Sequence, residues 1–132
     1  MIEVLAMDAD FLDQMVPEAT FKHREESMAG RVLMELGGEL DMFISPALAA
    51  RFHELAEDGE QDVVVDLNEA RFIDTHVLET FVTAQRELQA HQHALAVVAD
   101  NPYARRTIEL TGLDETLRIS RSRDEALARL GS

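Results

Sequence analysis

The chain has 132 residues, of which 46% are hydrophobic and 29% are charged, as expected for one soluble globular domain with its own hydrophobic core. Its 26 acidic and 12 basic residues leave a formal net charge of −14, which disfavours direct binding to nucleic acid or to an anionic membrane surface. There is no cysteine, so disulfides, thiolate catalysis and cysteine-bound zinc are excluded.

Residues 1–19 form an acidic N-terminal extension, and we assign residues 20–132 to the domain proper. The extension has no Lys or Arg, so it lacks the basic start of a signal peptide. No apolar run in the chain approaches the roughly 18 residues of a membrane helix, and we expect a cytoplasmic protein. The apolar residues of the extension could form a short docking helix that ends at Pro17, or a frayed tail. Whether the extension contributes to a homodimer is left open.

Two β-capable runs follow the extension. They cover Thr20–Glu25 and Arg31–Leu36, and Ser27-Met28-Ala29-Gly30 between them has the residues of a turn. The pattern predicts an N-terminal β-hairpin. We expect Gly37-Gly38 to end the second strand.

The first helix is predicted to begin at Ser45-Pro46, a hydroxyl N-cap followed by proline at the first helical position. Its apolar residues Leu48, Phe52 and Leu55 share one face, and Asp58-Gly59 ends it. Val63-Val64-Val65 then predicts a strand covered on both faces, because it is continuously apolar and β-branched.

Phe72-Ile73 is expected to extend the far end of that strand. The second helix is predicted from Asp74-Thr75 to about Ala90. The apolar residues of this helix recur at steps of four, three and four, which predicts one buried face; they are Val77, Phe81, Ala84 and Leu88.

The C-terminal third adds two predicted strands and two predicted helices. Ala94–Ala99 predicts a buried strand, and Asn101-Pro102 caps a third helix that ends at Gly112, with Ile108 and Leu110 facing inward. A short strand at Leu117–Ile119 and a helix at Arg123–Leu130 complete the chain. The order predicts an α/β fold with a mixed, largely parallel sheet of four to five strands and four helices.

Functional sites in such folds usually lie where strands lead into helices. Thr75 follows a buried strand at the first turn of a helix, where the unpaired backbone N–H groups tolerate added negative charge. Thr75 could therefore accept a phosphoryl group, although local sequence alone favours simple capping by Asp74 and Thr75. A catalytic triad of Asp74, Thr75 and His76 is disfavoured, because adjacent helical residues point about 100° apart.

Other chemistries lack essential residues. An aspartate phosphorelay could use Asp66 and Asp74, but the only lysine, Lys22, lies in the first predicted strand. We expect His91 and His93 to lie in a solvated turn rather than to bind a metal, because the sequence offers no obvious third ligand. There is no G-x-G-x-x-G or Walker pattern, and no cofactor is expected.

Four stretches, in order and at fitting separations, resemble the STAS-domain family, the anti-sigma-factor antagonists of bacteria. The resemblance covers roughly Thr20 to Leu130 and implies the STAS fold. The stretches are Gly38-Glu39-Leu40-Asp41, Val63-Val64-Val65-Asp66-Leu67, Phe72-Ile73-Asp74-Thr75-His76-Val77-Leu78 and Arg105-Arg106-Thr107-Ile108-Glu109-Leu110-Thr111-Gly112-Leu113.

The resemblance implies a partner switch without enzymatic activity of its own. Family members bind an anti-sigma factor, a serine/threonine kinase of the histidine-kinase-like ATPase type, and so release a sigma factor. That kinase, with its own ATP and magnesium, would phosphorylate the position of Thr75, and a separate phosphatase would reset the switch. The matching partner-binding positions are Asp41, Asp74, Thr75 and His76.

This sequence departs from the family motif at three positions. Thr75 replaces serine, His76 replaces a second small hydroxyl residue and Val77 replaces glycine.

An alternative within the same fold is a STAS subunit that regulates a lipid-transport ATPase without phosphorylation. Genomic neighbours would separate the two functions. An enzyme that uses Asp74 and His76 is a third hypothesis, and it would need a substrate pocket beside them.

Overall fold

An antiparallel hairpin opens the described part of the chain, residues 21–131 of a computed structural model. Strand β1 (Phe21–Met28) pairs with β2 (Arg31–Leu40). Ala29 and Gly30 make the turn with φ values of 32° and 82°, the left-handed backbone that tight hairpins require. The predicted hairpin is confirmed, although β1 and β2 are longer than expected. The extension at residues 1–19 lies outside the described residues.

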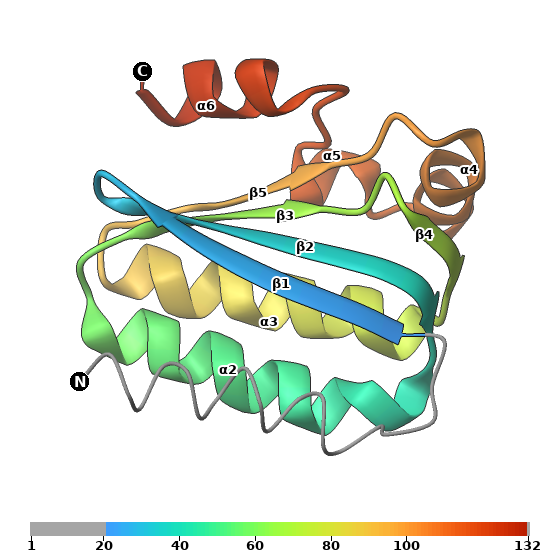
Figure 1. The fold of residues 1–132 in the computed structure, drawn as a ribbon, viewed down its shortest axis with the longest axis horizontal. Coiled ribbons are helices and arrows are strands. Elements are labelled where there is room, and N and C mark those ends of the chain that lie inside the picture. The colour runs from blue at the N-terminus through green and yellow to red at the C-terminus, as the bar shows by residue number, and fades with distance from the viewer. Residues whose placement is uncertain (1–20, 132) are drawn as a thin grey trace.

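The strands form one five-stranded sheet (Figure 1) with the order β1-β2-β3-β5, and β4 pairs with the far end of β2. Strands β3 (Asp62–Asp66), β4 (Ala70–Ile73) and β5 (Leu95–Val98) all run parallel to their neighbours. Only the β1–β2 pairing is antiparallel among them, so the predicted mixed, largely parallel sheet is confirmed.

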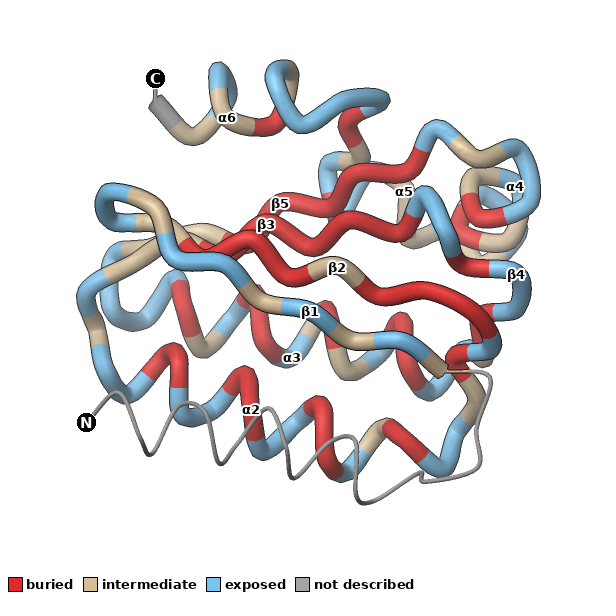
Figure 2. The backbone as a smooth tube through the Cα atoms, in the orientation of Figure 1, coloured by how far each residue is buried: buried red, intermediate tan, exposed pale blue. Residues whose placement is uncertain are grey.

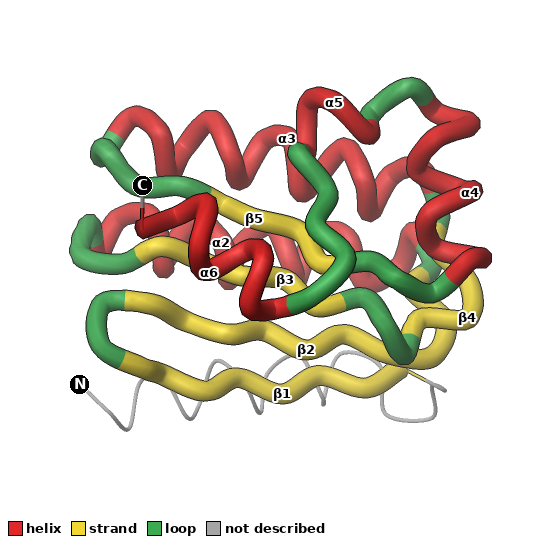
Figure 3. The backbone as a smooth tube through the Cα atoms, turned by 90° about the horizontal axis from the view of Figure 1, so that it is seen from above, coloured by secondary structure: helices red, strands yellow, loops and turns green. Residues whose placement is uncertain are grey.

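Two long helices cover one face of the sheet and one short helix covers part of the other (Figures 1 and 3). Helices α2 (Ser45–Asp58) and α3 (Thr75–Ala90) lie side by side on the first face, and α6 (Arg123–Gly131) lies over the second. None of the helices formed by residues 21–131 combines the length and apolar composition needed to cross a bilayer.

Three further helical elements complete the described part of the chain. They are the 3-10 helix η1 (Met42–Ile44) after β2, α4 (Pro102–Thr111) after β5, and α5 (Asp114–Leu117). The described residues therefore contain five α-helices, one more than the four predicted. Helix α4 contacts β4 and lies at the same end of the molecule (Figure 3).

The main core lies between the sheet and helices α2 and α3, where the buried residues concentrate (Figure 2). Phe52 of α2 and Phe81 of α3 meet edge to face, with ring centroids 5.8 Å apart. The second face has a smaller core, in which Leu33 and Val64 of the sheet contact Ala126 of α6. Alternate residues of β2 and β3 thus face different cores, which explains why residues 32–34 and 63–65 are continuously apolar.

Gly37-Gly38 does not end the second strand, contrary to the prediction. Strand β2 continues to Leu40 through a register shift between Gly38 and Glu39. Gly38 has a φ of 77°, and a Cβ on Gly37 would lie 3.1 Å from the Cβ of Glu69. The glycines therefore permit a bulge and a close approach of the loop before β4, and both distort the strand without breaking it.

Phe72-Ile73 was expected to lengthen β3, and this is also wrong. These residues belong to β4, which pairs with β2 beyond the bulge. The chain turns after β3 because the Asp66 carboxylate accepts a hydrogen bond from the backbone N–H of Asn68 at 2.8 Å.

Two predictions near the C-terminus are wrong as well. Leu117–Ile119 is not a strand: helix α5 ends at Leu117, and Arg118 adopts a left-handed φ of 50°. Only Ser120 makes a single bridge, to Val98 of β5. Ile108 is buried as predicted, but Leu110 is 75% exposed.

An ion-pair network joins β1 to α2 inside the protein. Arg51 donates from Nη2 to Glu25 Oε1 at 2.6 Å and from Nε to Glu25 Oε2 at 2.9 Å, and His23 Nε2 lies 2.8 Å from the same carboxylate. Burial raises the pKa of Glu25, but the hydrogen bonds from Arg51 and His23 outweigh it and lower this pKa to about 2. The charged carboxylate is thus favoured in the folded state.

We expect Glu25→Gln to lower the free energy of unfolding by about 3 kcal/mol at neutral pH, because Arg51 loses its buried counter-charge. The pKa of Glu25 is depressed on folding, so its stabilising effect is complete above the unfolded-state pKa near 4.5 and is lost as the pH falls toward about 2. Urea denaturation followed by circular dichroism at several pH values measures this difference.

Glu26→Gln is the matched control, since Glu26 is the exposed neighbour on the same strand. It should change the free energy of unfolding by less than about 0.5 kcal/mol. Equal effects of the two substitutions at neutral pH would contradict this role of the network.

Candidate functional site

Asp41 and Asp74 follow the ends of two neighbouring strands. Leu40 of β2 and Ile73 of β4 are parallel register partners, and the Asp74 N–H donates to the Leu40 carbonyl at 2.8 Å. Asp41 and Asp74 directly follow these two strand ends. The structure therefore brings the predicted site residues Asp41, Asp74, Thr75 and His76 to one edge of the sheet.

Asp74 alone caps the start of α3. Its backbone is extended, and its Oδ1 accepts a hydrogen bond from the backbone N–H of His76 at 2.8 Å. Thr75 is the first helical residue and is exposed. Within residues 21–131 its hydroxyl makes no hydrogen bond, so Thr75 has no capping role.

His76 pairs with the capping carboxylate. Its Nδ1 lies 2.6 Å from Asp74 Oδ1, while the imidazole stays more than half exposed. The hydrogen bond with Asp74 raises the pKa of His76, and the nearby charges of Asp74 and Glu79 raise it further. The backbone and side-chain hydrogen bonds from His76 lower the pKa of Asp74. The Asp74 carboxylate thus contacts both the backbone N–H and the imidazole of His76.

Val77 does not reach the surface. It is fully buried under the start of α3, as the periodicity predicts. Its branched side chain packs in the main core, so replacement of the family's glycine places no bulk on the exposed side of the helix.

Exposed apolar side chains surround the acidic edge. Met42 and Phe43 of η1 are 48% and 76% exposed, and Phe72 of β4 is 42% exposed. Asp41 caps η1, because its Oδ1 accepts from the Phe43 N–H at 2.9 Å. Apolar side chains held rigidly at the surface beside polar groups are typical of protein-binding sites.

Sequence reasoning did not identify Met42, Phe43 and Phe72 as surface residues. The available signal was a run of three apolar residues between Asp41 and the helix start at Ser45, a position where a loop would normally be polar. For Phe72 the signal was weaker, because a phenylalanine beside Ile73 is equally typical of a buried strand.

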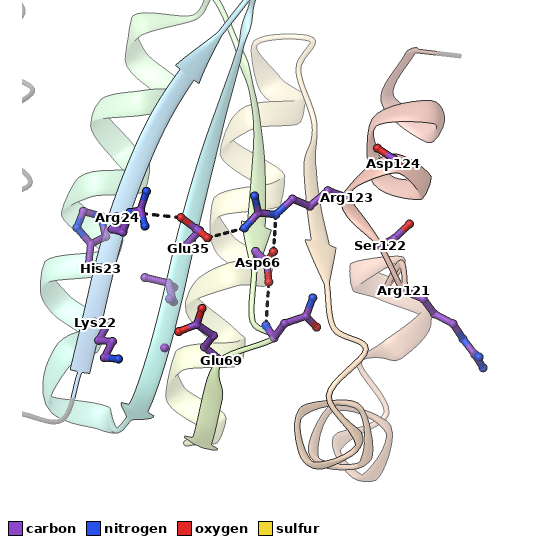
Figure 4. A pocket seen from close by; sticks show the side chains of 13 residues that line it. Lys22, His23, Arg24, Glu35, Asp66, Glu69, Arg121, Ser122, Arg123 and Asp124 are labelled. Atoms are coloured by element: carbon purple, nitrogen blue, oxygen red, sulfur yellow. Dashed lines mark hydrogen bonds and ion pairs between the residues drawn. The ribbon is translucent and has the colours of Figure 1, made fainter.

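A large polar cavity lies away from Thr75. It has a volume of about 660 Å³ between the hairpin and the start of α6 (Figure 4). Arg123 donates from Nε to Asp66 Oδ2 at 2.7 Å and also pairs with Glu35, whose other oxygen lies 3.5 Å from Arg24. These charges pair with one another and hold α6 to β2 and β3. Asp74 and His76 do not line this cavity.

His91 and His93 do not form a separate site. His93 Nδ1 lies 3.1 Å from Asp62 and its Nε2 lies 3.0 Å from the Gly59 carbonyl, so both ring nitrogens contact neighbouring groups. His91 is exposed. No cluster of three metal-ligating side chains occurs in the part of the chain that the structure describes.

Known proteins with similar sequences are regulators of sigma factors by name. The anti-sigma-F factor antagonist RsfB of Mycobacterium tuberculosis is 31% identical over 98 residues, which cover 74% of this chain and 80% of RsfB. The anti-sigma-B factor antagonist of Staphylococcus aureus is 26% identical over 87 residues, which cover 66% of this chain and 81% of that protein.

Solved structures agree in fold. An anti-sigma factor antagonist from Mycobacterium paratuberculosis superposes with a TM-score of 0.75 at 28% identity, over 85% of this chain and 95% of that protein. The unphosphorylated form of the antagonist SpoIIAA superposes with a TM-score of 0.65 at 18% identity, over 84% and 99% of the two chains, which supports the fold alone.

The family comparison covers the same region. The model of the STAS domain matches residues 21–126, nearly all of the described sheet and helices. The chain therefore belongs to the STAS domain family.

Proposed function

We propose that this chain is an anti-sigma-factor antagonist that binds an anti-sigma factor through the edge around Thr75 and thereby releases a sigma factor in the cytoplasm. The observation that carries the proposal is that Thr75 is exposed at the start of α3, while Asp74 and not Thr75 caps the helix. It lies at the acidic edge formed by Asp41 and Asp74, beside the exposed Phe43. The names of the relatives at 31% and 26% identity support the same function.

The partner in this proposal is a serine/threonine kinase of the histidine-kinase-like ATPase type. It transfers the γ-phosphoryl group of its own ATP to Thr75 Oγ1: the bond from the β–γ bridging oxygen to the γ-phosphorus breaks, the Oγ1–phosphorus bond forms and ADP leaves. The hydroxyl proton passes to a base of the kinase. A separate phosphatase hydrolyses the phosphate, and the antagonist itself contributes Asp41, Asp74 and His76 as binding residues.

Local electrostatics explain how phosphorylation would weaken binding. A phosphate adds about −1.5 to −2 charges next to the Asp74 carboxylate. The backbone N–H of His76 already donates to the Asp74 carboxylate, and the backbone N–H of Val77 already donates to the Asp74 carbonyl. Few backbone N–H groups in the first turn of α3 therefore remain to bind the phosphate. Within an interface this charge is poorly compensated, and a 100-fold loss of affinity requires only about 2.7 kcal/mol.

We expect Thr75→Ala to retain the anti-sigma kinase and Thr75→Glu to lose it, because the glutamate adds a fixed charge at the proposed interface. Tagged wild type and both variants serve as baits in the native host, and mass spectrometry identifies the captured proteins. Recombinant kinase with ATP and magnesium should phosphorylate wild type at Thr75 and leave Thr75→Ala unmodified at that site.

Thr83→Glu is the matched control, since Thr83 is an exposed threonine further along the same helix. It should bind the kinase like wild type. Recovery of a transporter ATPase, or of partners insensitive to the change at Thr75, would overturn the proposed switch and favour the transport-regulator alternative.

Phosphorylation of Thr75 should also raise the pKa of His76 further, because the phosphate adds negative charge beside an imidazole that already pairs with Asp74. Asp74→Asn should lower the same pKa, since it removes the carboxylate that favours the imidazolium. NMR titration of the histidine ring signals measures both changes.

His53 is an internal reference in the same spectra. A hydrogen bond with Glu87 raises its pKa, and neither modification touches that pair. A His76 titration that is unchanged by both the phosphate and Asp74→Asn would contradict the described contact.

A further inference from the structure

Helix α4 exposes a stripe of three side chains, Tyr103, Arg106 and Leu110, called here the α4 stripe. Tyr103 and Leu110 are seven residues apart, which is two helical turns, and therefore share one face. They are 40% and 75% exposed. Arg106 lies between them and is also exposed.

The α4 stripe does not belong to the main core. The helix packs through Ala104 and Ile108, which are fully buried on its other side. Among residues 21–131, the Arg106 side chain forms no ion pair or hydrogen bond. Tyrosine and arginine dominate the energetic centres of protein interfaces, and an exposed leucine beside them adds apolar area.

Helix α4 lies at the same end of the molecule as the start of α3 (Figures 1 and 3). Asn101, the cap of α4, donates from Nδ2 to the Ala70 carbonyl of β4 at 2.6 Å. Strand β4 ends at Ile73, directly before Asp74. Strand β4 therefore connects the start of α4 to the start of α3.

The two regions differ in charge. The edge around Thr75 carries Asp41 and Asp74, whereas α4 carries Arg105 and Arg106 in an otherwise strongly acidic chain. Arg105 has Glu109 nearby, with 3.9 Å between the charged atoms. The exposed positive charge of Arg106 fits an acidic residue on the partner.

A second copy of this chain fits poorly. In a two-fold contact the antiparallel α4 helices would place Tyr103 against Leu110 and bring Arg106 near its own copy, because Arg106 lies midway between them. The two arginines would repel each other, as would two chains with a net charge of −14 each. The stripe therefore favours a different protein.

We propose that the α4 stripe is a second anchor on the same partner that binds around Thr75. That partner presents an apolar pocket for Leu110 and Tyr103 and an acidic residue opposite Arg106. The inference rests on the proposed function only for the identity of the partner. Because the stripe lies outside the α3 start, this anchor persists when Thr75 is phosphorylated.

Site-specific cross-linking in the native host tests the shared partner. A photoreactive benzoylphenylalanine replaces Leu110 in one variant, Phe43 in a second and Ala128, an exposed residue of α6, in a control. We expect positions 110 and 43 to give adducts with the same protein and position 128 to give none with it. Adducts from Phe43 without adducts from Leu110 would overturn the second anchor and leave the proposed function standing.

The remaining outcomes are also decisive. If positions 110 and 43 label one protein that is not an anti-sigma factor, the second anchor stands and the proposed function fails. If position 110 labels a second copy of this chain, or nothing, the second anchor is wrong.

Affinity measurements provide a second test, in which the protein identified by cross-linking is purified in its free form. Arg106→Glu and Leu110→Ser should each weaken binding at least tenfold, and Arg106→Glu should also weaken the residual binding of Thr75→Glu. Arg86→Glu makes the same charge change at an exposed site of α3 and should bind like wild type. Unchanged affinity in both stripe variants, with wild-type thermal melts, would overturn the inference.

Discussion

The hydrogen bond from the Asp74 N–H to the Leu40 carbonyl closes the pairing of β2 with β4, and the whole site depends on it. It fixes the two strand ends relative to each other, so the loop with Asp41 and the start of α3 begin at a defined separation. Strand β4 reaches this position only because β2 bends at Gly38 and continues. A backbone irregularity thus determines where the acidic edge and its exposed apolar side chains lie.

Charge is distributed unevenly around this framework. Glu25 and Arg51 are buried between the hairpin and α2, and Arg123 pairs with Glu35 and Asp66 on the opposite face. Both networks connect the sheet to helices and have most of their charges paired. Asp41 and Asp74 instead cap helical elements at the surface, where one oxygen of each carboxylate accepts a backbone hydrogen bond.

Much of the fold could be predicted from the sequence, because periodicity and caps are local signals. The approximate start of α2, the Asp74 cap and the buried face with Val77 and Phe81 follow from such patterns. The predicted capping role of Ser45 is wrong, because Ser45 is the first helical residue, Ile44 occupies the N-cap position and no side chain caps α2. The errors lie where tertiary contacts decide: Gly37-Gly38 continues as a bulged strand because β4 pairs beyond it, and Leu117–Ile119 cannot pair fully because α5 and the left-handed Arg118 occupy that segment. The exposure of Phe43 and Leu110 also depends on what packs nearby, which spacing alone does not reveal.

In the first turn of α3, surface residues and core residues are separated by a single peptide bond. Thr75 and His76 face outward and carry none of the core, whereas Val77 and Leu78 are fully buried. Under the proposed function, substitutions at position 76 would therefore alter which partner is accepted with little effect on folding stability. A cell that keeps several such switches could limit crosstalk among them by diversifying this one position, while the packing beneath it stays the same.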